Sequence, residues 1–203
     1  MTERYRLSFT TGGLFVRESE DIARRFLQGG TWAETRAAVR LENVLQVRTA
    51  TASLRISKEV ISRLEMLQRK EVEFLIDCSY SDRACLLWTA VCRRYEFVKE
   101  FAQEVLRENY VLMRGRVTLS NFDAFLNSKA LWHDELDQLA KSTQSKLRQN
   151  LFRMMREAGF INLQYSTLQA MPSSALVQLL AQQGADELTI FPVSDLDIKR
   201  WLQ

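Results

Sequence analysis

The residues best suited to ligand chemistry lie in one basic segment between Asp137 and Glu157. This interval contains no acid and five cations, namely Lys141, Lys146, Arg148, Arg153 and Arg156. Duplex DNA carries one negative charge for roughly every 1.7 Å of its axis, so an acid-free surface suits it. Ser142 and Thr143 stand at the start of a helical pattern, where hydroxyls and free backbone N–H groups can bind a phosphate. The segment therefore predicts a nucleic-acid-binding helix.

A helical projection divides this segment into two faces. The apolar face collects Leu147, Leu151, Met154 and Ala158. The opposite face collects Ser145, Lys146, Gln149, Arg153 and Arg156. Gln and Arg side chains are the types that recognise base edges in the major groove. We therefore predict DNA contacts from Ser142, Thr143, Gln144, Ser145, Lys146, Arg148, Gln149 and Arg153.

The elements around this helix follow the order of a winged helix-turn-helix. A short helix over residues 132–139, a tight turn and the basic helix are followed by Gly159, which is a common helix stop. In such motifs the second helix enters the DNA groove. The expected wing, residues 162–171, has no Lys or Arg and could contact phosphates only through neutral donors. The alternative is a solvated amphipathic helix without a ligand.

A second basic segment covers residues 43–58, which also contain no acid. Its cations are Arg48, Arg55 and Lys58. They are the second set of predicted DNA-binding residues, because they repeat the charge pattern of the first segment.

The rest of the chain predicts helices with few breaks. Only two prolines and seven glycines interrupt it, which favours long helices over many short strands. A first helix is expected to end near Leu27. Further helices are expected over residues 32–43, 54–67, 71–77, 82–113 (one or two helices) and 173–182, and in the region after Ser120. Thr31 and Glu34 form the capping-box pattern at the start of the helix over residues 32–43.

Two short apolar runs predict strands, at residues 160–163 and 188–191. The expected fold is therefore mainly α, with helix-turn-helix character and a C-terminal winged helix carrying a small β-hairpin. Gly115 to Thr118 marks the expected linker. It divides an N-terminal helical domain, residues 1–115, from a C-terminal winged-helix-like domain, residues 116–203.

The residue types needed for catalysis or metal binding are sparse. Cys78, Cys85 and Cys92 lie seven residues apart, the last two in a strongly apolar stretch that is typical of buried thiols. The single histidine, His133, is expected at the surface or at a helix cap, and the glycine pairs lack the spacing of a phosphate-binding loop. We expect no enzyme, no cofactor, no metal and no small-molecule substrate.

No segment predicts membrane insertion or export. The longest uncharged apolar run, Ala84–Cys92, is much shorter than the roughly 20 residues that span a bilayer. Charged residues in Met1–Leu7 with no apolar core after them do not form a secretory signal. We expect a cytoplasmic protein.

Motifs spread along the chain resemble the BrxA family of bacteriophage-exclusion (BREX) defence systems. They are residues 7–14 (LSFTTGGL), 17–19 (RES), 87–95 (LWTAVCRRY), 101–108, 122–125 (FDAF), 132–136 (WHDEL), 146–149 (KLRQ), 153–159 (RMMREAG) and 191–193 (FPV). The resemblance implies a non-catalytic accessory protein with helix-turn-helix-like modules that binds double-stranded DNA. It also brings an alternative to DNA binding, since the family has been likened to NusB-type helical RNA-binding proteins.

Three functions are left open by these patterns. The first is a duplex-DNA-binding accessory protein of a BREX system. The second is an adaptor whose helical surface docks other BREX proteins, and the third is an RNA-binding protein.

Overall fold

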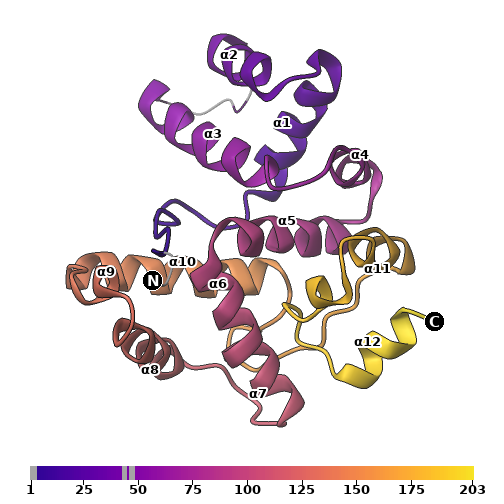
Figure 1. The fold of residues 1–203 in the computed structure, drawn as a ribbon. Coiled ribbons are helices and arrows are strands. Elements are labelled where there is room, and N and C mark those ends of the chain that lie inside the picture. Colours follow the sequence, from indigo (N-terminus) through magenta and orange to yellow (C-terminus); the bar gives the residue numbers. More distant parts are fainter. Residues whose placement is uncertain (1–3, 43–44, 46–48) are drawn as a thin grey trace.

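The computed structural model describes residues 4–42, 45 and 49–203, and these fold into helices joined by short loops (Figure 1). The helices are α1 (Val16–Gly29), α2 (Trp32–Glu42), α3 (Ala50–Leu64), α4 (Arg69–Asp77), α5 (Tyr80–Arg94), α6 (Glu96–Phe101), the π-helix η1 (Ala102–Arg107), α7 (Glu108–Val111), α8 (Leu119–Ala130), α9 (Asp134–Asp137), α10 (Lys141–Glu157), α11 (Ser174–Ala181), the 3-10 helix η2 (Ala185–Leu188) and α12 (Asp195–Trp201). The expectation of a mainly helical fold is confirmed.

Helices α1, α2 and α3 form the upper lobe of Figure 1, with α4 at its edge. Gly30 ends α1 in the left-handed conformation that glycine adopts readily, and Thr31 then starts α2. The Thr31 hydroxyl oxygen accepts the Glu34 backbone N–H at 3.2 Å, and the same hydroxyl donates to the Glu34 carboxylate at 2.6 Å, so one half of the predicted capping box is present. Stacking of Phe26 on Trp32, with ring centroids 3.9 Å apart, fixes the turn between the two helices.

Helix α5 lies beneath this lobe and is enclosed by other elements. Residues 84–92 are buried without interruption, so no face of the helix across that stretch reaches solvent. A helix that is apolar all round requires cover from every side. Helices α1, α3 and α4 provide it from the upper lobe, and α6 and α10 provide it from below.

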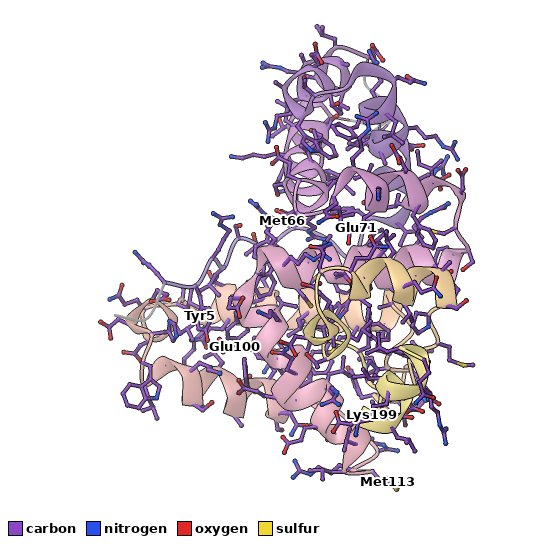
Figure 2. The ribbon with its side chains drawn as sticks, turned by 45° about the vertical axis from the view of Figure 1, so that its right-hand side comes forward. Tyr5, Met66, Glu71, Glu100, Met113 and Lys199 are labelled. Atoms are coloured by element: carbon purple, nitrogen blue, oxygen red, sulfur yellow. The ribbon has the colours of Figure 1, made fainter. Side chains whose placement is uncertain are left out.

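Buried charges connect the upper lobe to α5. The fully buried Glu71 carboxylate of α4 accepts hydrogen bonds at 2.7 and 2.9 Å from the Arg93 guanidinium of α5, and a third from the Gln183 amide. Arg93 also pairs with Glu187. Figure 2 shows Glu71 at this junction. Losing one partner of a buried pair costs about 3–5 kcal/mol, so this contact holds α4 firmly on α5.

Helices α8, α9 and α10 follow one another as a short helical unit. Thr118, not Ser120, caps α8, and its hydroxyl forms a capping box with Asn121. The long helix α10 runs behind α6 in Figure 1 and contacts α5. Leu147, Leu151 and Met154 are fully buried, as the helical projection predicted.

The described residues contain no β-strand, so the predicted β-hairpin is wrong. Residues 160–163 supply only one isolated antiparallel bridge, Ile161 to Thr167, and a second bridge joins Arg116 to Ser166. Residues 188–191 lie at the end of η2 and in a turn. The Trp88 indole N–H donates to the Ile190 carbonyl at 3.0 Å, and the apolar side chains of this turn fill the core around Trp88, so no strand partner is needed.

The N-terminal segment, residues 4–14, lies along α10. The Asn150 amide of α10 donates to the Phe9 carbonyl, and the Glu157 carboxylate accepts the Leu14 N–H. A Cβ atom at Gly13 would lie 2.1 Å from that carboxylate, so only glycine allows this approach. Gly13 therefore serves packing.

The division at residues 115–116 stays a prediction. The described buried apolar side chains form one cluster that extends from Tyr5 to Ile198. The Gly115 carbonyl accepts the Thr167 N–H at 3.0 Å, so the segment that was expected to be a linker is tied to the chain after α10.

Replacing Gly13 by Ala is expected to lower the free energy of unfolding by about 1–3 kcal/mol, because the displaced Glu157 carboxylate would leave the buried Leu14 N–H without its acceptor. Urea denaturation followed by circular dichroism measures this change. Gly29→Ala is the matched control: a Cβ there meets only a terminal Arg25 nitrogen at 3.9 Å. The control should be neutral or slightly stabilising. Unchanged stability of Gly13→Ala would contradict the packing role.

Candidate nucleic-acid interface

The polar face of α10 is open to solvent. Lys146, Gln149 and Arg153 are exposed, while the apolar residues one and two turns away are anchored in the core. Ser142 is also exposed, and Arg156 lies further along the same face. The helix therefore presents one polar stripe, with no acid of its own from Lys141 to Arg156, at a position fixed by its buried side.

The first turn of α10 differs in detail from the predicted start. The helix begins at Lys141, after Ala140, and neither Ser142 nor Thr143 caps it. Thr143 and Ser145 are half-buried, and the Gln144 amide donates to the Leu139 carbonyl at 3.3 Å. Gln144 thus already has one protein partner.

Two of the predicted cations are paired with acids. Arg148 makes two hydrogen bonds, at 2.8 and 2.7 Å, to the carboxylate of Asp123 on α8. Arg153 donates to Glu157 at 2.7 Å. These exposed pairs are weak and contribute about 1 kcal/mol or less. A phosphate that displaces the acid loses about this much binding energy.

Lys141, Lys146 and Arg156 have no ion pair with any other described residue. Lys141 and Arg156 were outside the predicted set, although both lie in the acid-free run. The pairing of Arg148 depends on α8 and was not visible in the local sequence. Among the described cations of α10, these three are therefore more readily available to a phosphate than Arg148 and Arg153, which are paired with acids.

The second predicted set is only partly described. Arg55 and Lys58 are exposed on α3, in the upper lobe and away from α10. Arg48 lies outside the described residues. The structure does not bring the two basic segments together on one helix face.

The turn after α10 packs against the helix through aromatic side chains. Tyr165 has a positive φ of 63° and contacts Phe152 edge to face, with ring centroids 5.5 Å apart. Phe152 is buried although it lies beside the apolar face formed by Leu147, Leu151 and Met154, and this contact helps to account for its burial. The turn is thus held to α10 by packing, in line with its lack of basic residues.

The N-terminal segment is anchored by Tyr5. Its ring stacks on His133 at 3.8 Å, its hydroxyl donates to Glu100 and its backbone N–H donates to Glu135. Burial, followed by the contact with the Glu100 carboxylate, raises the pKa of the Tyr5 phenol far above its ordinary value. His133 sits at the N-cap position of α9, but its ring is buried beneath Tyr5, so it is not a surface residue.

The cysteines and acids do not gather into a reactive site within the described part of the chain. Burial raises the pKa of the Cys85 thiol to about 12 and that of Cys92 well above its usual value, which disfavours the reactive thiolate. No group of three or more His, Cys, Asp or Glu side chains among the described residues is placed to hold a metal ion. Across those same residues no helix combines the length and the apolar character needed to cross a bilayer.

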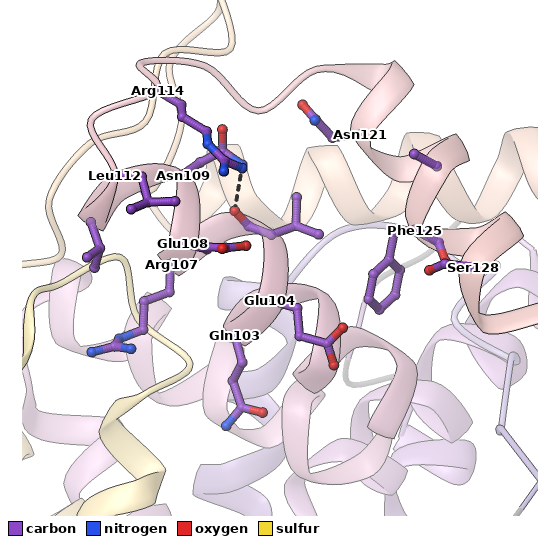
Figure 3. Close-up of a pocket in the computed structure, with 13 residues that line it drawn as sticks. Gln103, Glu104, Arg107, Glu108, Asn109, Leu112, Arg114, Asn121, Phe125 and Ser128 are labelled. Carbon is purple, nitrogen blue, oxygen red and sulfur yellow. Dashed lines mark hydrogen bonds between the residues drawn. The ribbon is translucent and has the colours of Figure 1, made fainter.

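A cleft of about 650 Å³ lies between η1–α7 and α8 (Figure 3). Its lining mixes acids and bases, including Glu104, Glu108, Arg107 and Arg114, with apolar residues such as Leu112. The acids balance the bases, so the cleft has no charge preference for nucleic acid. At its edge Val111, Leu112 and Met113 are exposed, Met113 by 91%.

Sequence comparison with known proteins gives one family. A family model described as BrxA matches residues 3–184. The BREX protein BrxA of Escherichia coli O9:H4 (strain HS) is 27% identical over 180 residues, which span 85% of this chain and 83% of that protein. The BREX protein BrxA of Paramagnetospirillum magneticum (strain ATCC 700264 / AMB-1) is 26% identical over 165 residues, spanning 78% of this chain and 79% of that protein.

A solved structure shows the same fold. The crystal structure of an uncharacterized protein from Magnetospirillum magneticum superposes with a TM-score of 0.81 at 23% sequence identity, and covers 94% of this chain and 100% of that one. Because the BrxA model spans most of the sequence, from the N-terminal segment to the end of α11, the chain belongs to the BrxA family.

Proposed function

We propose that this BrxA-family chain binds double-stranded DNA through the outer face of α10, as a non-enzymatic accessory protein of a BREX phage-defence system acting in the cytoplasm. The observation that carries the proposal is the exposed acid-free stripe on α10, on a helix whose opposite face is buried. A recognition helix needs both properties, since it must project into a groove while its own position is fixed by packing.

The order of elements supports a winged helix-turn-helix reading of this region. The chain passes from the bridge residue Arg116 through α8, α9 and α10 to the bridge at Ile161, turns, and returns through Ser166 and Thr167. Thus the extended segment around Ser166 and Thr167 pairs with both earlier segments, as the last strand of a winged helix does. The bridges are too short to count as strands, but their order matches that motif.

The free cations set the expected salt dependence. If only Lys141, Lys146 and Arg156 neutralise phosphates, the slope of log K against log salt is about −2.7, and it approaches about −4.5 if Arg148 and Arg153 also release their acids. A fourfold rise in salt would then weaken binding by about 40-fold in the first case and about 500-fold in the second.

Replacing Lys141, Lys146 and Arg156 together by Gln is expected to weaken duplex-DNA binding at least tenfold and to flatten the salt slope by about 2 to 3. None of the three makes an ion pair with another described residue, so the fold should be retained. Fluorescence anisotropy with a random-sequence duplex at four salt concentrations measures both quantities.

The matched control replaces Arg40, Lys70 and Lys199 by Gln. These residues are exposed on α2, α4 and α12, and their replacement removes the same charge. This control should keep most of the affinity. Equal losses in the two variants would reduce the effect to net charge and contradict an α10 interface. Stronger binding of structured RNA than of duplex DNA by the unmodified protein would favour the RNA-binding alternative.

A second candidate function is docking of another BREX protein, and the exposed apolar tip of α7 favours it. Val111 and Leu112 line the 650 Å³ cleft, and these two and the adjacent Met113 are each at least 41% exposed. Neighbouring exposed apolar side chains of this kind mark interaction sites. This tip lies at the end of the molecule opposite the upper lobe, as the label of Met113 in Figure 2 shows. No residue of this tip belongs to α10.

Leu112→Asn combined with Met113→Asn is expected to abolish co-purification of a stoichiometric BREX partner while duplex-DNA affinity stays within twofold of the unmodified protein. Asn tolerates the positive φ of Met113. Leu41→Asn with Met171→Asn, which removes one exposed Leu and one exposed Met elsewhere, is the control. Retention of the partner by the Leu112/Met113 variant would exclude this docking surface.

A further inference from the structure

Three arginines without acidic partners among the described residues line one pocket, which shares no residue with α10 or with the cleft beside α7. The pocket has a volume of about 330 Å³ and lies between the N-terminal segment and the corner where α5 meets α6. Arg4 and Arg6 line one wall and Arg94 lines another. Tyr5 and Met66, on two sides of this pocket, are labelled in Figure 2.

The charge of this pocket is not balanced by the described residues. Arg4, Arg6 and Arg94 form no ion pair with any described residue. The one acid in the lining, Glu96, is paired with Lys99 at 3.0 Å. The fourth arginine, Arg93, is already neutralised by Glu71 and Glu187. An excess of three positive charges therefore remains around one small volume.

The buried end of Arg94 lacks a hydrogen-bond partner. Its Nε atom is inaccessible to solvent and donates to no group of the described chain. Its guanidinium is held over the Tyr95 ring, 5.6 Å from the ring centroid. A buried donor left unpaired destabilises the protein, so a ligand group that reaches this N–H and accepts it gains binding energy.

The two arginines of the N-terminal segment are placed by the residue between them. Tyr5 is buried, with its ring against His133 and Phe97, whereas Arg4 and Arg6 are exposed on either side. Alternation of this kind directs the two arginines away from the buried ring, toward one common side. The anchoring bonds of Tyr5 to Glu100 and Glu135 fix the backbone that carries them.

We propose that Arg4, Arg6 and Arg94 form a phosphate-binding pocket, separate from the face of α10. Guanidinium groups bind phosphate oxygens through paired, charge-assisted hydrogen bonds. A phosphate monoester carries about −1.5 to −2 charges at neutral pH, which the three cations offset. The phosphate belongs either to a small ligand such as a nucleotide or to the backbone of a bound nucleic acid.

The first arm of the test uses inorganic pyrophosphate and the full-length protein. Isothermal titration calorimetry at constant ionic strength should show saturable binding that weakens at least tenfold in Arg4→Gln/Arg6→Gln. Arg40→Gln/Lys199→Gln removes the same charge from exposed sites and should leave binding unchanged. Arg94→Lys keeps the charge but loses the Nε donor and should give an intermediate loss.

The second arm distinguishes the source of the phosphate. If the pocket grips a nucleic-acid backbone, Arg4→Gln/Arg6→Gln also lowers duplex-DNA affinity, flattens the salt slope by about 1 to 2, and pyrophosphate competes with DNA. If the ligand is small, DNA binding by this variant stays unchanged while pyrophosphate binding is lost.

The proposal is overturned if the pocket variant and its control bind pyrophosphate equally, or if the unmodified protein does not bind it. Because pyrophosphate binding is measured without DNA, this result is independent of whether α10 contacts a duplex. Thermal melting of each variant within about 3 °C of the unmodified protein confirms that the exposed substitutions leave the fold intact.

Discussion

The burial of α5 is the constraint on which the rest of this fold depends. Nine consecutive residues from Ala84 to Cys92 are buried, so the helix has no solvent-facing side over two and a half turns. Elements from both halves of the chain must cover it, which is why α3, α4 and α10 all contact one helix. Trp88 adds a directional bond to this packing by donating to the Ile190 carbonyl near the C-terminus.

Covering α5 also determines which face of α10 is available. Leu147, Leu151 and Met154 must point toward the core, and the fixed geometry of a helix then turns Lys146 and Gln149 outward. The N-terminal segment adds a second restraint through Phe9 and Leu14, which are bound by Asn150 and Glu157. A rigidly placed basic stripe is what groove recognition requires, and it arises here from apolar packing on the opposite side.

Acidic residues determine which of the basic side chains are free to bind an anion. Asp123 and Glu157 pair with two of the α10 arginines, whereas Arg4, Arg6 and Arg94 at the N-terminal pocket have no acidic partner among the described residues. Formal net charge, only +3, does not reveal this difference. Local pairing decides where an anion can bind, because an exposed cation already satisfied by a carboxylate gains less from a phosphate.

The sequence alone determined the helical class, most helix positions and the two faces of α10. These features follow from local rules: 3.6-residue periodicity places Leu147 and Leu151 on one side, and Thr31 with Glu34 starts a helix whatever lies around it. The helix over residues 195–201 carries a similar local signal, since Ser194 and Asp197 form its capping box, but it was not predicted.

Only the tertiary structure decided the state of residues 188–191, the partner of Arg148 and the position of the N-terminal segment. An apolar run of four residues is compatible with a strand or a packed turn, and the Trp88 side chain, 102 residues away from Ile190, made the difference. Asp123 and Arg148 are 25 residues apart, and Arg4 meets Arg94 at one pocket across 90 positions. Such contacts depend on how the helices cover α5, and no local pattern in the chain records that arrangement.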